Sequence, residues 1–185
     1  MALTYSEMLP LATPAPDFKL PNVVSGKLES LSELKSPVAT VICFICNHCP
    51  YVIHIKSELI KVARDYQNKG VHFIAINSND TENYPQDGPE KMKAEAEDLH
   101  YPFPYLFDET QTVAKAYQAA CTPDFYVFDK DLKCVYRGRF DESSPGNNVA
   151  VTGKDLITAL DNLLQGTPIN PEQKPSMGCN IKWKK

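Results

Sequence analysis

The sequence has no long apolar run and no basic block, and only one of its 185 residues is tryptophan. No stretch approaches the roughly 20 apolar residues that a membrane-spanning helix requires. A formal net charge of −4 without a basic block gives no reason to expect nucleic acid as a partner. Residues 1–7 lack the basic and apolar segments of a secretory signal peptide. We therefore expect a cytoplasmic protein with no nucleic-acid partner and no membrane partner.

Six cysteines are present without extracellular cues, so a structural disulfide framework is not expected and redox or metal roles are favoured. The run Cys43-x-x-Cys46-x-x-Cys49 is spaced like part of a zinc or iron–sulfur site. No fourth cysteine follows at the required spacing. We therefore expect no metal and no cofactor. Cys43, Cys121 and Cys134 are interpreted as packing residues.

A buried strand, a cysteine-rich turn and a helix follow one another near the middle of the chain. Residues 38–44 form a β-branched apolar run, and Pro50 then precedes apolar residues at helical spacing. Cys46 and Cys49 therefore lie at a helix N-terminus, whose partial positive charge stabilises a thiolate, and His48 adds a donor or a charge. We predict a lowered pKa for Cys46, the attacking thiol, with Cys49 as the resolving thiol.

The rest of the chain predicts a single α/β domain over residues 1–185, with an N-terminal extension at 1–36 and a C-terminal tail at 166–185. The extension is expected to contain a small hairpin, and the segment 101–107 is expected to pair only at its end, at an edge of the sheet. Further strands are predicted at 71–77, 122–129 and 134–137, and helices at 32–35, 89–97, 112–119 and 155–164.

This order of elements resembles the thioredoxin fold, with Cys-x-x-Cys at the first strand-to-helix turn and Thr122-Pro123 before the third strand. The segments 14–21 and 122–125 resemble the peroxiredoxin-like (AhpC/TSA, redoxin) branch of that superfamily. The closing segment 178–184 resembles the tail of uncharacterised members of the branch. The resemblance implies a thioredoxin-like fold, in which a central mixed sheet is flanked by helices.

The resemblance also implies roles for individual residues. Cys46 attacks, Cys49 resolves, and Pro123, which follows Thr122, forms a cis peptide bond and packs against the sulfurs. An arginine near the last hairpin, Arg137, would steady a thiolate or a peroxide. His48 is similar in position to the histidine of the oxidant DsbA, which makes the disulfide more oxidising.

Cys179 lies beyond the last predicted helix, in a proline-containing tail that can reach back over the domain. One hypothesis makes it a second resolving thiol for a sulfenic acid on Cys46. The alternative, which we favour, is that Cys179 only helps Ile181 and Trp183 to dock the tail.

We therefore predict an enzyme, a thiol–disulfide oxidoreductase with a disulfide or peroxide substrate and a reducing partner of the thioredoxin or glutathione type. Antioxidant peroxidase activity is less strongly indicated. The peroxiredoxin motif Pro-x-x-x-Thr-x-x-Cys is not reproduced, because Pro37, Thr40 and Cys43 are one residue short and fall within the strand. The alternative is a non-catalytic thioredoxin-fold binding module or metal-binding scaffold, which would have no physical need for the cysteine pair.

Overall fold

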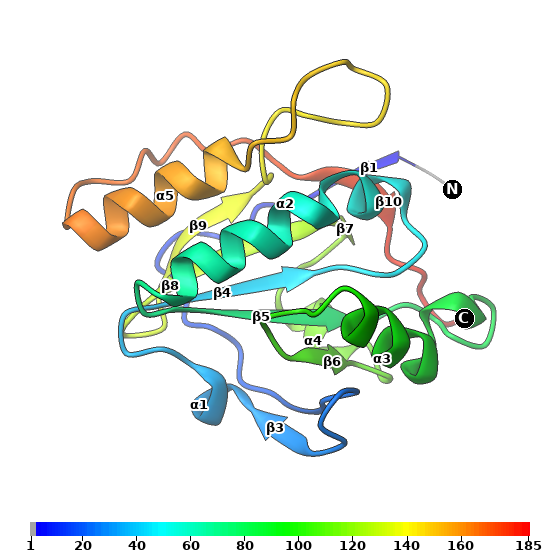
Figure 1. Cartoon of the computed structure of the whole chain (residues 1–185). Coiled ribbons are helices and arrows are strands. Elements are labelled where there is room, and N and C mark those ends of the chain that lie inside the picture. Colours follow the sequence, from blue (N-terminus) through cyan, green and yellow to red (C-terminus); the bar gives the residue numbers. More distant parts are fainter. Residues whose placement is uncertain (1–2) are drawn as a thin grey trace.

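The computed structural model describes residues 3–185 and has a five-stranded mixed sheet with helices on both faces (Figure 1). The strand order is β6-β5-β4-β8-β9. β4, β5 and β6 are mutually parallel, and β8 and β9 run antiparallel to their neighbours. This confirms the predicted thioredoxin-like fold. The strands are β4 (Ala39–Phe44), β5 (Val71–Asn77), β6 (Tyr105–Phe107), β8 (Asp124–Asp129) and β9 (Cys134–Gly138).

β4 is the central strand, and all six of its residues are buried. Val41 and Cys43 belong to the core on one face of the sheet, and Ile42 and Phe44 belong to the core on the other. A strand that is covered on both faces has a continuous apolar sequence rather than an alternating one. This is why the apolar run predicted a strand in the interior of the sheet.

Three helices contribute to the core that contains Val41 and Cys43. They are α2 (Pro50–Gln67), α3 (Pro89–Asp98) and α5 (Lys154–Gln165). Pro50 occupies the first turn of α2, where its missing N–H would have no intrahelical partner. Gly166 ends α5 with φ +69°, as its position predicted. The sequence-based bounds of these helices are therefore confirmed to within a few residues.

The other core packs under α1 (Leu31–Leu34) and α4 (Thr112–Ala116) and includes Leu9 and Phe18 from the start of the chain. The predicted helix at 112–119 is too long, because α4 ends at Ala116 and Gln118 adopts φ 54°. A left-handed residue is incompatible with a continuing helix. The predicted hairpin is confirmed and consists of β2 (Lys19–Pro21) and β3 (Leu28–Ser30).

A second sheet of three strands joins the two ends of the chain to the body. β10 (Met177–Asn180) lies between β1 (Leu3–Tyr5) and β7 (Cys121–Thr122), antiparallel to both. The sequence predicted neither β1 nor β10. β1 and β10 lie beside the start of α2, so this sheet faces the cysteine turn (Figure 1).

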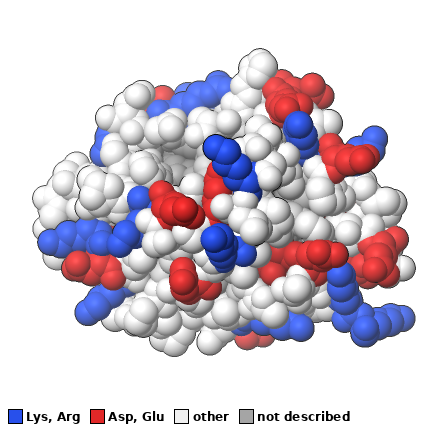
Figure 2. All heavy atoms as spheres, turned by 90° about the horizontal axis from the view of Figure 1, so that it is seen from below, with Lys and Arg blue, Asp and Glu red and all other residues white. Residues whose placement is uncertain are grey.

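Lys and Arg side chains are interspersed with Asp and Glu on the face shown in Figure 2. That face therefore carries no extended field of one sign. Within residues 3–185, no helix is both long enough and apolar enough to span a bilayer.

Candidate active site

The two cysteines lie where β4 turns into α2, as the pattern predicted. Cys49 is the residue that precedes the first helical position of α2, and Cys46 lies in the turn before it. Both are buried, with 1% of Cys46 and none of Cys49 exposed, whereas Asn47 and His48 between them are half-buried. Both sulfurs are thus covered by the fold, and the residues between them are the part of the turn that reaches solvent.

Thr122 contacts both sulfurs from the opposite side. The peptide bond between Thr122 and Pro123 is cis, as the resemblance implied. The Cys46 Sγ lies 3.5 Å from Thr122 Oγ1, and the Cys49 Sγ lies 3.2 Å from the backbone oxygen of Thr122, to which it donates when it is protonated. In this segment it is the threonine before the proline that contacts the two sulfurs.

A buried carboxylate, which the sequence did not predict, holds the turn between the cysteines. Asp87 ends the 3-10 helix η1 (Pro85–Asp87) and is completely buried. Its Oδ1 accepts from the backbone N–H groups of Asn47 at 2.9 Å and His48 at 3.3 Å. Its Oδ2 contacts His48 Nδ1 at 2.6 Å and accepts from Asn79 Nδ2 at 2.8 Å. No local pattern marked Asp87, because it lies 39 residues from His48 in a turn-rich segment.

His48 is fixed by two neighbours. Its ring stacks on Tyr84, with centroids 5.4 Å apart and planes 13° apart. The short contact to a carboxylate oxygen of Asp87 indicates that Nδ1 carries a proton and donates it to Asp87. The Cys46 Sγ is 3.9 Å from the same nitrogen. The donor of His48 is therefore directed mainly at Asp87, and only weakly at the sulfur.

Cys46 and Cys49 are joined by a hydrogen bond. Because Cys46 donates to it, the pKa of Cys49 is lowered to about 4, although burial opposes this. The pKa of Cys46 is raised well above its ordinary value by the same bond, by burial and by the Asp87 carboxylate. This direction is opposite to the predicted lowering of the Cys46 pKa. The hydrogen bond to Cys49 is its largest cause, and the Asp87 carboxylate, which could not be located from the sequence, adds to it.

Arg137 has other partners than the predicted thiolate or peroxide. Its Nε donates to the backbone oxygen of Leu9 at 2.8 Å, and its Nη1 donates to Gln173 Oε1 at 2.7 Å. Arg137 thus ties the start of the chain to the tail. These contacts give no support to the accessory role that the resemblance implied.

The remaining cysteines fall into two groups. Cys43, Cys121 and Cys134 are almost completely buried, and burial raises the pKa of each thiol, to about 12 for Cys43 and about 11 for Cys134. This agrees with their interpretation as packing residues. Cys179 lies in β10, opposite Thr122, and belongs to the same core as Cys46 and Cys49.

Three side chains of the site form a candidate metal-ligand set. The ligand atoms of Cys46, His48 and Asp87 lie within 4.8 Å of one another. Both oxygens of Asp87 already accept hydrogen bonds, and one contacts His48 Nδ1, so a metal ion bound to that nitrogen would have to replace the bond between Asp87 and His48. The geometry therefore favours a positioned histidine over a metal centre.

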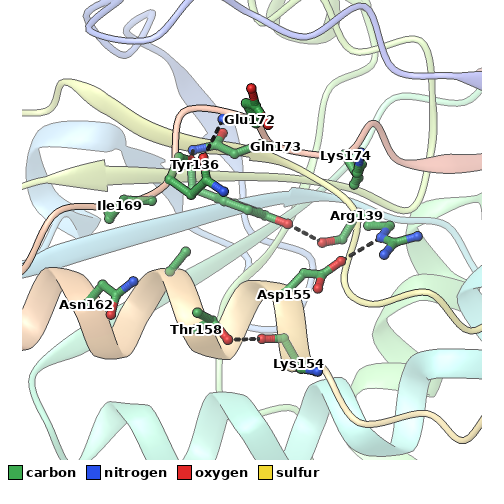
Figure 3. A pocket seen from close by; sticks show the side chains of 12 residues that line it. Tyr136, Arg139, Lys154, Asp155, Thr158, Asn162, Ile169, Glu172, Gln173 and Lys174 are labelled. Atoms are coloured by element: carbon green, nitrogen blue, oxygen red, sulfur yellow. Dashed lines mark hydrogen bonds and ion pairs between the residues drawn. The ribbon is translucent and has the colours of Figure 1, made fainter.

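One cavity adjoins the site, and another lies away from it. One, of about 300 Å³, is bordered by Tyr51, Pro123 and Phe140 and therefore adjoins the proline that follows Thr122. The other, of about 340 Å³, lies between α5 and the tail and is lined by Tyr136, Arg139 and Asp155 among others (Figure 3). Neither cavity is lined by a cysteine, but the first borders Pro123, next to the residue that contacts both sulfurs.

Solved structures similar to this chain share its whole fold. An uncharacterized conserved protein from Geobacillus kaustophilus has 60% sequence identity and a TM-score of 0.98, with 100% of this chain and 97% of that chain covered. A hypothetical protein from Sinorhizobium meliloti has 46% identity and a TM-score of 0.95, with 98% of each chain covered.

A more distant structure has a related fold. The peroxidoxin BcpB from Mycobacterium tuberculosis has 18% identity and a TM-score of 0.62, with 86% of this chain and 98% of that chain covered. A search of curated proteins finds no significant match. The AhpC/TSA family matches residues 11–137, which is more than half of the sequence and includes β4, the cysteine turn and Thr122-Pro123. The chain therefore belongs to the AhpC/TSA family.

Proposed function

We propose that this protein is a thiol–disulfide oxidoreductase in which Cys46 and Cys49 form and break a disulfide. The observation that carries the proposal is a pair of hydrogen-bonded thiols at the start of α2, with Thr122 against both sulfurs. A pair of this kind keeps one sulfur as thiolate at neutral pH, and the thiolate is the nucleophile of thiol–disulfide exchange. Family membership supports the same class of redox chemistry.

Cys46 is the attacking thiol in this proposal, because it lies in the turn before α2, whereas Cys49 is the cap residue of the helix. Its proton passes to the Cys49 thiolate as its sulfur attacks one sulfur of a substrate disulfide, and the other substrate sulfur leaves. Cys49 then attacks the Cys46 Sγ, and its proton goes to the second substrate sulfur as that sulfur leaves. The products are a reduced substrate and a Cys46–Cys49 disulfide. A reducing dithiol partner, or two equivalents of a monothiol such as glutathione, restores the pair.

The cavity beside Pro123 supports a peptide disulfide as substrate. Tyr51, Pro123 and Phe140 give part of its wall apolar and aromatic surface, and charged residues, among them Glu142 and Lys174, line another part. Apolar wall surface of this kind binds apolar groups, and the polar groups beside it can bind a peptide backbone. A residue next to the substrate cysteine would therefore place an apolar side chain there, and hydrogen peroxide would gain nothing from it.

Thiol peroxidase activity is the second candidate, and the family match favours it. Two features of the site argue that it is slower than disulfide exchange. Burial raises the pKa of the Cys43 thiol to about 12, and Thr40 Oγ1 already accepts from the backbone N–H of Ser36. The motif-like residues of β4 thus do not make a peroxide pocket. The Asp87 carboxylate also disfavours a thiolate on Cys46.

The proposal is tested in single turnovers with a disulfide-linked peptide that has an apolar residue beside its cysteine. The reduced wild-type protein should release both peptide thiols and retain a Cys46–Cys49 disulfide. The Cys49→Ser variant should stop at a mixed disulfide on Cys46, and the Cys46→Ser variant should lose most of the rate.

The Cys134→Ser variant is the matched control, because it removes a buried thiol outside the site. It should react like the wild type. Trapping of the peptide on Cys49, or full turnover by the Cys49→Ser variant, would contradict the proposed roles. If one equivalent of hydrogen peroxide oxidises the pair faster than the peptide does, the peroxidase candidate replaces the exchange candidate.

A further inference from the structure

A third thiol reaches the cysteine pair from the opposite end of the chain. Cys179 is directly paired with Thr122 in the three-stranded sheet, and only 5% of it is exposed. Thr122 is also the residue that contacts the sulfurs of Cys46 and Cys49. Thr122 is therefore a neighbour of all three thiols.

The side chain of Cys179 is directed to Cys49. A hydrogen bond from Cys179 contributes to the stabilisation of the Cys49 thiolate, after the larger contribution of Cys46. Cys49 thus has a thiol partner on each side, Cys46 in the turn and Cys179 in β10. Sulfurs in hydrogen-bond contact need only small movements to approach bonding distance.

Glycine at position 178 allows the tail to come this close. A Cβ at Gly178 would lie 2.0 Å from the backbone oxygen of Thr122, well inside any permitted contact, and 3.3 Å from Pro123 Cδ. The backbone of β10 thus approaches Thr122 at a distance that only glycine permits. The neighbouring residue, Cys179, is carried against the pair by this approach.

Both flanks of Cys179 are held by buried hydrogen bonds. On one side, Ser6 donates its N–H to the Ser176 oxygen at 3.0 Å and accepts the Ser176 N–H at its Oγ at 2.8 Å. On the other side, the Lys182 N–H donates to Asn79 Oδ1 at 2.8 Å. Gln111 Nε2 donates to the Lys182 oxygen at 2.7 Å. The tail around Cys179 is therefore a fixed part of the site.

We propose that Cys179 is a third redox-active thiol, which takes over the disulfide of the Cys46–Cys49 pair at the sulfur of Cys49. The Cys179 thiolate attacks the Cys49 Sγ, the bond between Cys46 and Cys49 breaks, and Cys46 leaves as a thiolate. Cys179 loses one proton when it forms the attacking thiolate, and the Cys46 thiolate that leaves can take up one proton. No external oxidant is consumed, because one disulfide is exchanged for another. This inference rests on the proposed function of the pair.

The protonation state of Cys179 depends on the redox state of the pair. In the reduced protein its pKa is raised to about 12 by burial, by the hydrogen bond to Cys49 and by the charge of Cys49. A Cys49 that is bonded to Cys46 has no thiolate charge, so two of these causes disappear on oxidation. The Lys182 ammonium, which lowers the Cys179 pKa, remains. Cys179 therefore becomes a better nucleophile when there is a disulfide to attack.

The exchange would leave an oxidised chain with a free Cys46. Cys46 lies in the turn before α2, next to the half-buried Asn47 and His48, whereas Cys49 caps α2 and Cys179 lies in β10. The chain could then store the disulfide in its interior while Cys46 reacts with a second substrate. The alternative is that Cys179 only helps to dock the tail on the body. That role predicts no change in the Cys179 thiol on oxidation.

The proposal is tested by mapping disulfides in full-length protein by mass spectrometry, after rapid acid denaturation and alkylation of free thiols. The Cys46→Ser variant, oxidised with one equivalent of the thiol oxidant diamide, should form a Cys49–Cys179 disulfide and lose nearly all alkylatable Cys179. Wild-type protein oxidised with one equivalent of a peptide disulfide should contain chains in which Cys46 is alkylated and Cys179 is bonded. The Cys121→Ser variant, which lacks another buried thiol of the same sheet, should behave like the wild type.

Two results overturn the inference. One is Cys179 that stays fully alkylatable in the oxidised Cys46→Ser variant. The other is oxidised wild-type protein in which every disulfide joins Cys46 to Cys49. In the second case the proposed function stands, because the pair is oxidised without the third thiol. If the wild type forms neither disulfide with the peptide, the proposed function itself fails.

Discussion

At the scale of single residues, the proposed chemistry depends on one carboxylate. Asp87 receives the two backbone N–H groups between the cysteines and the ring of His48, and its charge opposes ionisation of Cys46. It therefore fixes the shape of the turn and favours a proton on Cys46 in the resting pair. A buried acid of this kind is a positioning residue, since it acts on the sulfur through the turn and the histidine.

Replacing Asp87 by asparagine should lower the pKa of Cys46. The Asp87→Asn variant keeps an acceptor oxygen for the turn but removes the charge that disfavours the thiolate. The measurement is the pH dependence of iodoacetamide alkylation in a Cys49→Ser background, where Cys46 has no thiol partner in the turn. The midpoint should move to lower pH than in the Cys49→Ser protein.

The matched control is Glu82→Gln, which also removes an acidic charge from the turn-rich segment but at an exposed side chain. It should leave the midpoint close to that of the parent. A midpoint that rises in the Asp87→Asn variant would contradict the account.

The cysteine pair could be predicted from the sequence because its signal is local. An apolar run, two thiols, Pro50 and helical spacing stand next to one another, and the physics of a helix start applies to any such segment. The contacts of Asp87 with the cysteine turn and of Cys179 with Cys49 could not be predicted in this way. These contacts join residues far apart in the sequence, and neither Asp87 nor Cys179 belongs to a periodic pattern.

At the scale of elements, β10 connects the tail to the cysteine pair. It lies between β1 and β7, so the three-stranded sheet combines a strand from each end of the chain with the strand before Pro123. Short strands of this kind have little sequence signal, because their pairing is set by distant partners rather than by alternation. For the same reason a tail with several prolines predicted an extended arm and not a strand.

A Gly178→Ala substitution should displace β10 from the site. The added methyl group would collide with the backbone oxygen of Thr122, which cannot move aside as a flexible side chain would. Overpacking of this type costs about 1–3 kcal/mol, so the free energy of unfolding in urea should fall by that amount. The yield of the Cys49–Cys179 disulfide in the Cys46→Ser background should fall as well.

Gly88→Ala is the matched control, because Gly88 also has a negative φ and its added Cβ would lie 3.2 Å from the Pro85 oxygen. It should cost less stability and should leave the disulfide yield unchanged. An unchanged yield in the Gly178→Ala variant would show that the close approach of β10 is not what brings Cys179 to Cys49.

At the scale of the whole molecule, a second buried acid links stability to pH. Asp124 in β8 is completely buried next to Pro123, and burial raises its pKa to about 7, against hydrogen bonds from Ser176 and Tyr126. Its ordinary pKa is about 3.9. The folded state therefore binds this proton more tightly than the unfolded state does. The resulting stability is complete below about pH 4 and is lost as the pH rises through 7.

The oxidised protein should accordingly lose stability between about pH 4 and pH 7, with a contribution from Asp124 of up to about 1.4 kcal/mol per pH unit. Oxidation removes the titration of Cys46 and Cys49 from the measurement. Urea unfolding of the Asp124→Asn variant should show a flatter dependence on pH in this range. Asp131→Asn, at an exposed turn residue, should keep the wild-type slope, and an equal slope in both variants would exclude Asp124 as its source.

The fold as a whole was accessible from the sequence because its central elements are long and strongly patterned. β4, β5, α2 and α5 follow their predicted bounds closely, and the resemblance supplied the mixed sheet with flanking helices. The contacts between distant parts of the chain could not be predicted. The three-stranded sheet and the hydrogen bonds of Asp87 join segments that come together only when the chain has folded.

The central claim is that Cys46 and Cys49 share one proton, so that the reduced pair contains one thiolate at neutral pH. Its most direct test is a pH titration of the ultraviolet absorbance of the thiolate in the reduced protein, with Cys46→Ala and Cys49→Ala variants in parallel. For the wild type, the account predicts one thiolate per chain, with a titration midpoint near pH 4. In the Cys46→Ala and Cys49→Ala variants, no thiolate should titrate with this midpoint. A thiolate that forms only near the ordinary pKa of about 8.5 would contradict it.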